Sequence, residues 1–199
     1  QTNLELKQKR STEGVIKTKN MIEEAIEGGM EGEIIVFPET ALIFSQSEMA
    51  DWIGHIEHQA REKGITLLTG IVEREDNYKV RNRILGLGEA DTHYDKIKLV
   101  PFGEFIPFER LTGKLFDIFG LKLTNTVPGE ELNIINAGNI RISASICYEI
   151  AFPDLIRKTA PDSNLIVTIS NDTWFGSSYG PIQHLEIAQN RALEHKKVI

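Results

Sequence analysis

Short apolar runs separated by turn residues predict a series of β-strands along the chain. The predicted strands are residues 34–37, 65–72, 82–87, 92–100, 132–136, 141–146 and 165–170. The run at 34–37 is continuously apolar, as expected for a strand that is covered on both faces, and the strands at 65–72 and 165–170 are also predicted to be buried. In residues 141–146 apolar side chains alternate with polar or small ones, which is the period of a strand.

Apolar residues at helical spacing predict three amphipathic helices, at residues 11–27, 49–60 and 181–194. A serine or threonine can cap the first helix, and two glycines end it. A shorter helical segment, residues 151–157, is also predicted. Strands and helices therefore alternate, with strand pairs between some helices, and this order predicts a layered α/β sandwich in one domain.

The segment from Pro101 to Leu123 (residues 101–123) has no single period. It combines phenylalanine, leucine and isoleucine with glycine and proline, and it is too long and too apolar for an ordinary surface loop. Two interpretations stay open here. The segment is either a subsidiary helix pair packed on the core, or an exposed apolar arm that meets lipid or a partner protein.

Charge and cysteine content narrow the function classes. The formal net charge is -7 and no dense basic cluster offsets it, which argues against a nucleic-acid partner. The chain has one cysteine, Cys147, so no disulfide can form within it, and the paired-cysteine spacing of metal sites is lacking. We therefore expect neither a metal nor a cofactor.

Cys147 lies where a predicted strand ends and a helical segment begins. The positive pole of a helix lowers a thiol pKa from about 8.5 and so favours the nucleophilic thiolate. Glu39 and Lys96 lie on or just after two other predicted strands. A glutamate beside a thiol can take its proton, and a lysine can stabilise the oxyanion that forms when sulfur attacks a carbonyl. The backbone N–H of Tyr148 is a second oxyanion donor.

Taken singly, each of these residues also has a plainer interpretation. A lone cysteine is most often a small buried residue without chemistry. Glutamate and lysine at strand ends are usually solvated surface charges. Strand ends converge on one rim in a layered α/β fold, however, and this raises the odds that the three side chains meet.

Three short motifs contain these residues: F-P-E-T at 37–40, Y-D-K at 94–96 and S-I-C-Y-E at 145–149. They resemble the three motifs of the nitrilase (carbon–nitrogen hydrolase) superfamily. One branch, bacterial apolipoprotein N-acyltransferase, is more similar, because residues 94–107 and the aromatic loop S-N-D-T-W-F-G at 170–176 resemble its motifs as well. This resemblance implies a four-layer αββα sandwich of the nitrilase type.

The resemblance also implies roles for individual residues. Glu39 corresponds to the general base, Lys96 to the oxyanion stabiliser and Cys147 to the nucleophile. Further residues are implied to support this triad: Glu104, Tyr148 and Glu149. The resemblance also implies that Trp174 and Phe175 line the substrate site.

By the same resemblance, the activity is acyl transfer through a cysteine thioester. The donor is a phospholipid, and the acceptor is the N-terminal amine of a diacylglyceryl-modified apolipoprotein. The implied location is the periplasmic side of the bacterial inner membrane, reached through membrane helices and through the apolar arm of residues 101–123. We expect the 199-residue chain to be a fragment, lacking those helices and the first and last strands of the sandwich.

Two other functions stay open. A soluble carbon–nitrogen hydrolase that splits a small amide or nitrile would use the same triad with water as the acceptor. A non-catalytic interaction domain would keep the fold and leave Cys147 unreactive. Asn171 and Asp172 are expected to shape the loop beneath the site, and His184 is interpreted as structural, since the triad already contains a base.

Overall fold

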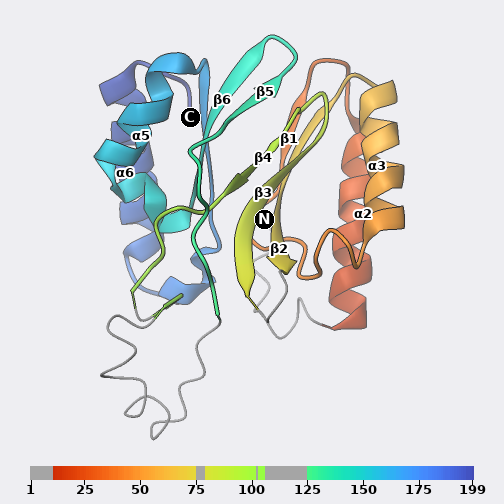
Figure 1. Cartoon of the computed structure of the whole chain (residues 1–199), viewed down its shortest axis with the longest axis horizontal. Coiled ribbons are helices and arrows are strands. Elements are labelled where there is room, and N and C mark those ends of the chain that lie inside the picture. Colours follow the sequence, from red (N-terminus) through yellow and green to blue (C-terminus); the bar gives the residue numbers. More distant parts are fainter. Residues whose placement is uncertain (1–10, 75–78, 102, 106–124) are drawn as a thin grey trace, which may run out of the picture.

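The computed structural model describes residues 11–74, 79–101, 103–105 and 125–199. In this part of the chain two β-sheets pack face to face, and helices cover the outer face of each sheet (Figure 1). The layers therefore run helix, sheet, sheet, helix, and the αββα sandwich is confirmed. Among the described residues, no helix is both long and apolar enough to cross a lipid bilayer.

The two halves of the sandwich follow each other along the chain. The first sheet has the strand order β1–β2–β3–β4, and the second has the order β5–β6–β7. The elements of the first half are α2 (Thr12–Gly28), β1 (Ile34–Val36), α3 (Ala50–Glu62), β2 (Thr66–Arg74), β3 (Val80–Gly88) and β4 (His93–Asp95). Those of the second half are β5 (Ile134–Ala137), β6 (Ile140–Ile146), η2 (Cys147–Ala151), α5 (Pro153–Thr159), η3 (Ala160–Asp162), β7 (Leu165–Ile169), η4 (Asp172–Phe175) and α6 (Gly180–His195).

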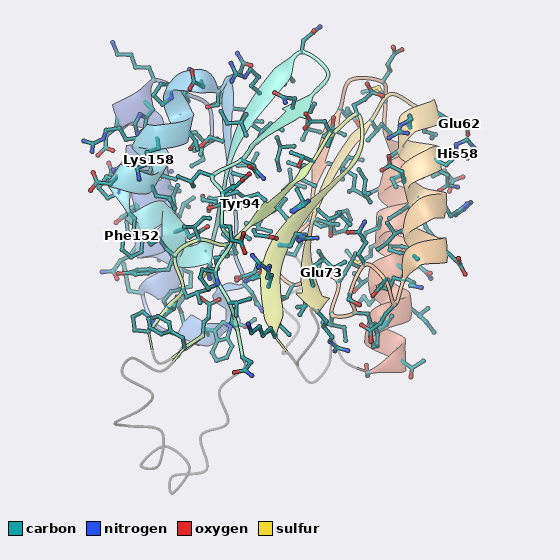
Figure 2. The ribbon with its side chains drawn as sticks, viewed as in Figure 1. His58, Glu62, Glu73, Tyr94, Phe152 and Lys158 are labelled. Carbon is teal, nitrogen blue, oxygen red and sulfur yellow. The ribbon has the colours of Figure 1, made fainter. Side chains whose placement is uncertain are left out.

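Successive residues of the central strands belong to different layers of the core. In β2, Leu67 and Ile71 pack in the cluster that contains residues of α2 and α3, whereas Leu68 packs in the cluster between the two sheets. Figure 2 shows Tyr94 in this middle layer, where its side chain is fully buried. A third cluster lies between the second sheet and the helices α5 and α6. The period-two placement of side chains thus gives both faces of β2 an apolar cover.

Two strand predictions differ from the structure. Residues 34–37 were expected to be covered on both faces, but Val36 is 44% exposed, because β1 is at the edge of its sheet in the described chain and pairs only with β2. The strand expected at 92–100 ends at Asp95. Its continuation turns away because the backbone N–H groups of Ile97 and Lys98 donate to the Glu149 carboxylate instead of to a neighbouring strand.

The interpretations of residues 101–123 stay predictions. Residues 102 and 106–124 lie outside the described part of the chain. The described residues of this segment form a turn in which Pro101 bridges Phe105, and this turn carries Glu104.

Candidate active site

Glu39 lies in a loop that interrupts the pairing of two parallel segments. The pairing stops after Val36 opposite Leu68 and resumes at Leu42 opposite Ile71, and Glu39 lies in the loop between these two points. Gly70 makes room for this loop, since a Cβ there would lie 2.5 Å from the carbonyl oxygen of Pro38. The Glu39 side chain is thereby turned into the protein and is 6% exposed.

One side-chain donor and one backbone donor orient the Glu39 carboxylate. Asn82, on β3, donates from Nδ2 to Oε1 over 2.6 Å. The backbone N–H of Asn171, which follows β7, donates to Oε2 over 2.9 Å. Because these donors come from the two different sheets, the position of Glu39 depends on the packing of one sheet on the other.

Lys96 directly follows β4 and is 2% exposed. Its Nζ lies 2.9 Å from Oε1 of Glu104 and 3.7 Å from Oε1 of Glu39. Burial disfavours the Lys96 cation, but the negative charges of Glu39 and Glu104 outweigh burial and raise the pKa of Lys96. Glu104 is held in turn by the backbone N–H of Val100, which donates to its Oε2 over 2.8 Å. The site therefore contains a buried ammonium group between two carboxylates.

Cys147 begins the short helix η2 directly after β6, and its thiol is half-buried. Its φ is +54°, a left-handed conformation that residues with a side chain rarely adopt. Nζ of Lys96 lies 3.7 Å from Oε1 of Glu39, and the charges of both residues act on the pKa of the Cys147 thiol, so the three predicted side chains lie near one another. The role of the Tyr148 backbone N–H as an oxyanion donor stays a prediction.

The predicted lowering of the Cys147 pKa is wrong. Burial raises the pKa of the thiol to about 11, and the negative charge of Glu39 adds to the increase. The Ser170 hydroxyl, the Lys96 charge and the Tyr148 N–H act in the opposite direction but do not compensate. The helical segment after Cys147 is a five-residue 3-10 helix, too short to build a strong dipole against the cost of burial. At neutral pH the Cys147 thiol is therefore expected to be protonated.

This raised pKa predicts the pH dependence of Cys147 alkylation. Only the thiolate reacts, and below the pKa its fraction grows about tenfold per pH unit. The rate should therefore still be rising at about pH 10, whereas a thiol of ordinary pKa would be levelling off there. Mass spectrometry after timed exposure to iodoacetamide measures the rate at the chain's one cysteine. A plateau near neutral pH would contradict the raised pKa.

Glu149, two residues after Cys147, is fully buried. Burial raises the pKa of Glu149, while hydrogen bonds from surrounding donors oppose that increase. The donors come from three segments and are the backbone N–H groups of Ile97, Lys98 and Ile146 and the hydroxyl of Tyr94. Glu149 thus ties the end of β6 to the segment that follows Lys96.

The remaining predicted site residues are exposed or partly exposed. Tyr148 is 46% exposed and packs edge-on against Phe152. Trp174 is 78% exposed in η4. Phe175, its neighbour, packs against the ring of His184. The expected substrate-lining role of Trp174 and Phe175 stays a prediction.

Two contacts of the site were not foreseen. Asn82 was assigned only to a predicted strand, although a polar residue in a buried strand is a signal for an internal hydrogen bond. His184 was interpreted as structural, yet its Nε2 lies 3.0 Å from the backbone carbonyl oxygen of Cys147 and its Nδ1 lies 3.1 Å from Oδ1 of Asp172. Among the described residues, no group of three or more His, Cys, Asp or Glu side chains is arranged to hold a metal ion.

Comparison with known sequences gives one family match. The model of the family described as "Carbon-nitrogen hydrolase" matches residues 1–197. Apolipoprotein N-acyltransferase of Photobacterium profundum is 35% identical over 175 residues, and that of Pseudomonas putida is 39% identical over 166 residues. These alignments cover 82% and 81% of this chain but 34% and 33% of those proteins. The chain therefore spans about a third of the length of the curated relatives it matches.

Solved structures with the same fold are more distant in sequence. The structure of Nit3 from Saccharomyces cerevisiae, a member of the nitrilase superfamily, aligns with a TM-score of 0.64 at 19% identity. An amidase from Nesterenkonia sp. aligns with a TM-score of 0.59 at 17% identity. Each alignment covers 92% of this chain and 67% of the other. At this identity the similarity shows the fold alone.

Proposed function

The chain belongs to the carbon–nitrogen hydrolase family, and on that premise we propose that it forms the catalytic part of a thiol acyltransferase. The proposed reaction moves a fatty acyl chain from a phospholipid, through a thioester on Cys147, to the N-terminal amine of a lipoprotein. One observation carries the proposal: the buried Lys96 ammonium lies 3.7 Å from the buried Glu39 carboxylate, and both charges act on the thiol of Cys147. The relatives named apolipoprotein N-acyltransferase support the choice of substrates.

In the first half-reaction, Glu39 takes the proton of the Cys147 thiol as sulfur attacks the carbonyl carbon of the phospholipid ester. The negative charge that develops on the carbonyl oxygen faces the Lys96 ammonium and the Tyr148 N–H. When the C–O bond breaks, the departing lysophospholipid takes the proton back from Glu39. The acyl chain is then held as a thioester.

In the second half-reaction, the amine of the diacylglyceryl-modified cysteine attacks the thioester carbon. Its proton passes to Glu39 and then to the sulfur of Cys147 as the C–S bond breaks. Glu104 takes no proton in this scheme. It holds the Lys96 ammonium beside the reacting oxygen, because its Oε1 accepts from Nζ over 2.9 Å.

The substrates set further expectations for the surface. Long acyl chains need an apolar path, and we assign this path to Trp174, Phe175 and the apolar arm of residues 101–123. The donor and acceptor are both lipid-modified, so the reaction belongs at a membrane. In this proposal the domain works on the periplasmic side of a bacterial inner membrane.

The test is the mass of Cys147 after the protein has been incubated with phospholipid. The protein is used in the longest form in which this chain occurs. We expect an acyl thioester adduct that disappears when a diacylglyceryl lipopeptide is added and that never forms in Cys147→Ala. Ammonia release from small amides without lipopeptide acylation would overturn the proposal in favour of a carbon–nitrogen hydrolase. A thiol that resists alkylation even at high pH would instead favour a non-catalytic domain.

A further inference from the structure

The backbone conformation of Cys147 needs stabilising contacts from other segments. Its left-handed φ of +54° lies at the junction of β6 and η2, and such a conformation persists only where the surroundings over-determine it. The side chain of Glu149 holds the residue before Cys147, through the N–H of Ile146. The carbonyl group of Cys147 itself faces the other way, toward α6, and its partner there is His184.

His184 is 8% exposed and is positioned on both of its nitrogens. Its Nε2 lies 3.0 Å from the Cys147 carbonyl oxygen, and its Nδ1 lies 3.1 Å from Oδ1 of Asp172. Asp172 also accepts a 2.6 Å hydrogen bond from the Ser170 hydroxyl. His184 therefore joins the backbone of Cys147 to the loop that follows β7.

The chemistry of the partners determines where the protons lie. A carbonyl oxygen only accepts, so Nε2 of His184 carries a proton and donates it. Nδ1 then faces a carboxyl oxygen, and this contact is attractive only if one proton lies between the two atoms. The ring of His184 is thus fixed in one orientation by an oxygen atom on each side. A fixed ring can in turn fix the position of the Cys147 carbonyl group.

We propose that His184 is a positioning residue for the nucleophile: its Nε2–H holds the Cys147 carbonyl group, and Asp172 orients the ring. Through this contact His184 maintains the left-handed turn that directs the thiol toward Glu39 and Lys96. The inference rests on the proposed function only in taking Cys147 as the nucleophile. No proton passes between His184 and the substrate.

Two isosteric substitutions separate this role from simple packing. The amide nitrogen of glutamine reaches about as far as Nε2 of histidine, so His184→Gln keeps a donor for the Cys147 carbonyl. The amide nitrogen of asparagine reaches about as far as Nδ1, so His184→Asn keeps the Asp172 contact and loses the other. The matched control is Gln183→Asn, a shortened amide at the exposed neighbouring position of α6.

The first readout is the pH profile of Cys147 alkylation in the 199-residue chain. We expect the unmodified chain, His184→Gln and Gln183→Asn to share one profile that still rises at about pH 10. In His184→Asn the midpoint should shift downward, toward that of an ordinary thiol, because the loosened thiol becomes less buried and lies farther from the negative charge of Glu39. Equal profiles for all variants, or equal shifts for the two His184 variants, would overturn the inference.

The second readout is the rate of thioester formation with phospholipid, in the same form of the protein as in the phospholipid test above. We expect His184→Asn to lower this rate by about a hundredfold, the loss that a displacement of about 1 Å can cause, with His184→Gln near the unmodified rate. Equal rates would overturn the positioning role. If the unmodified protein forms no thioester, the proposed function fails, while the alkylation profiles still decide the role of His184.

Discussion

Replacing Glu39 with glutamine should lower the rate of thioester formation at Cys147 by about 10²–10⁴-fold, the usual contribution of a general base. The site can accommodate the new side chain. Its oxygen can accept from the Asn171 N–H. Its amide can donate to Oδ1 of Asn82 once the Asn82 amide turns over, because Nδ2 now faces that position and Oδ1 is a buried atom without a hydrogen-bond partner in the described chain. The loss would therefore report on the missing base and not on a collapsed site.

The same variant should increase the thiolate fraction of Cys147, although it lowers the rate of thioester formation. After burial, the negative charge of Glu39 is the largest cause of the raised Cys147 pKa, so its removal should lower that pKa and shift the alkylation profile to lower pH. Glu39→Gln is thus expected to have more thiolate and less acyl transfer. Both quantities are measured by mass spectrometry of Cys147, with iodoacetamide and with phospholipid.

Glu62→Gln, at the end of α3 with a side chain that is 65% exposed, is the matched control and should change neither quantity. If Glu39→Gln keeps its rate of thioester formation, Glu39 is not the base. If both quantities fall together, the substitution has disturbed the site as a whole.

The second large effect is expected on stability. Glu149→Gln should lower the free energy of unfolding by about 2–4 kcal/mol, because glutamine offers one acceptor oxygen where the carboxylate offers two. The N–H groups of Ile97 and Lys98 use one oxygen of Glu149, and that of Ile146 uses the other. Whichever way the amide is turned, its own N–H groups meet a buried donor.

Denaturant unfolding measures this change. The control is Tyr148→Phe, next in sequence but 46% exposed, which should stay within about 0.5 kcal/mol of the unmodified chain. If Glu149→Gln proves as stable as this control, the carboxylate does not tie the end of β6 to the segment after Lys96.

Much of the secondary structure was predictable because its signals are local. Ser11 caps α2 as expected, with its hydroxyl accepting from the N–H of Gly14. The apolar spacing of residues 49–60 corresponds to α3, and the mostly apolar segment at 65–72 corresponds to β2. In each case the residues that determine the element lie within the element or next to it.

The site was predictable only in its chemical groups. Glu39, Lys96, Glu104 and Cys147 were identified from their motifs, and the structure brings them together. Asn82, whose Nδ2 holds Glu39, belongs to no motif recognised in the sequence. Its role depends on the distance between β3 and the loop after β1, and the order of residues along the chain does not contain that distance.

The thiol shows most clearly where local inference ends. From its place after a strand, Cys147 was expected to have a lowered pKa, but burial and the charge of Glu39 raise it. The sequence by itself determined the alternation of strands and helices and the reactive groups, because periodicity and short motifs are properties of neighbouring residues. Only the tertiary structure decided how the groups act on one another, because burial and electrostatic interactions depend on distances through space between segments far apart in the chain.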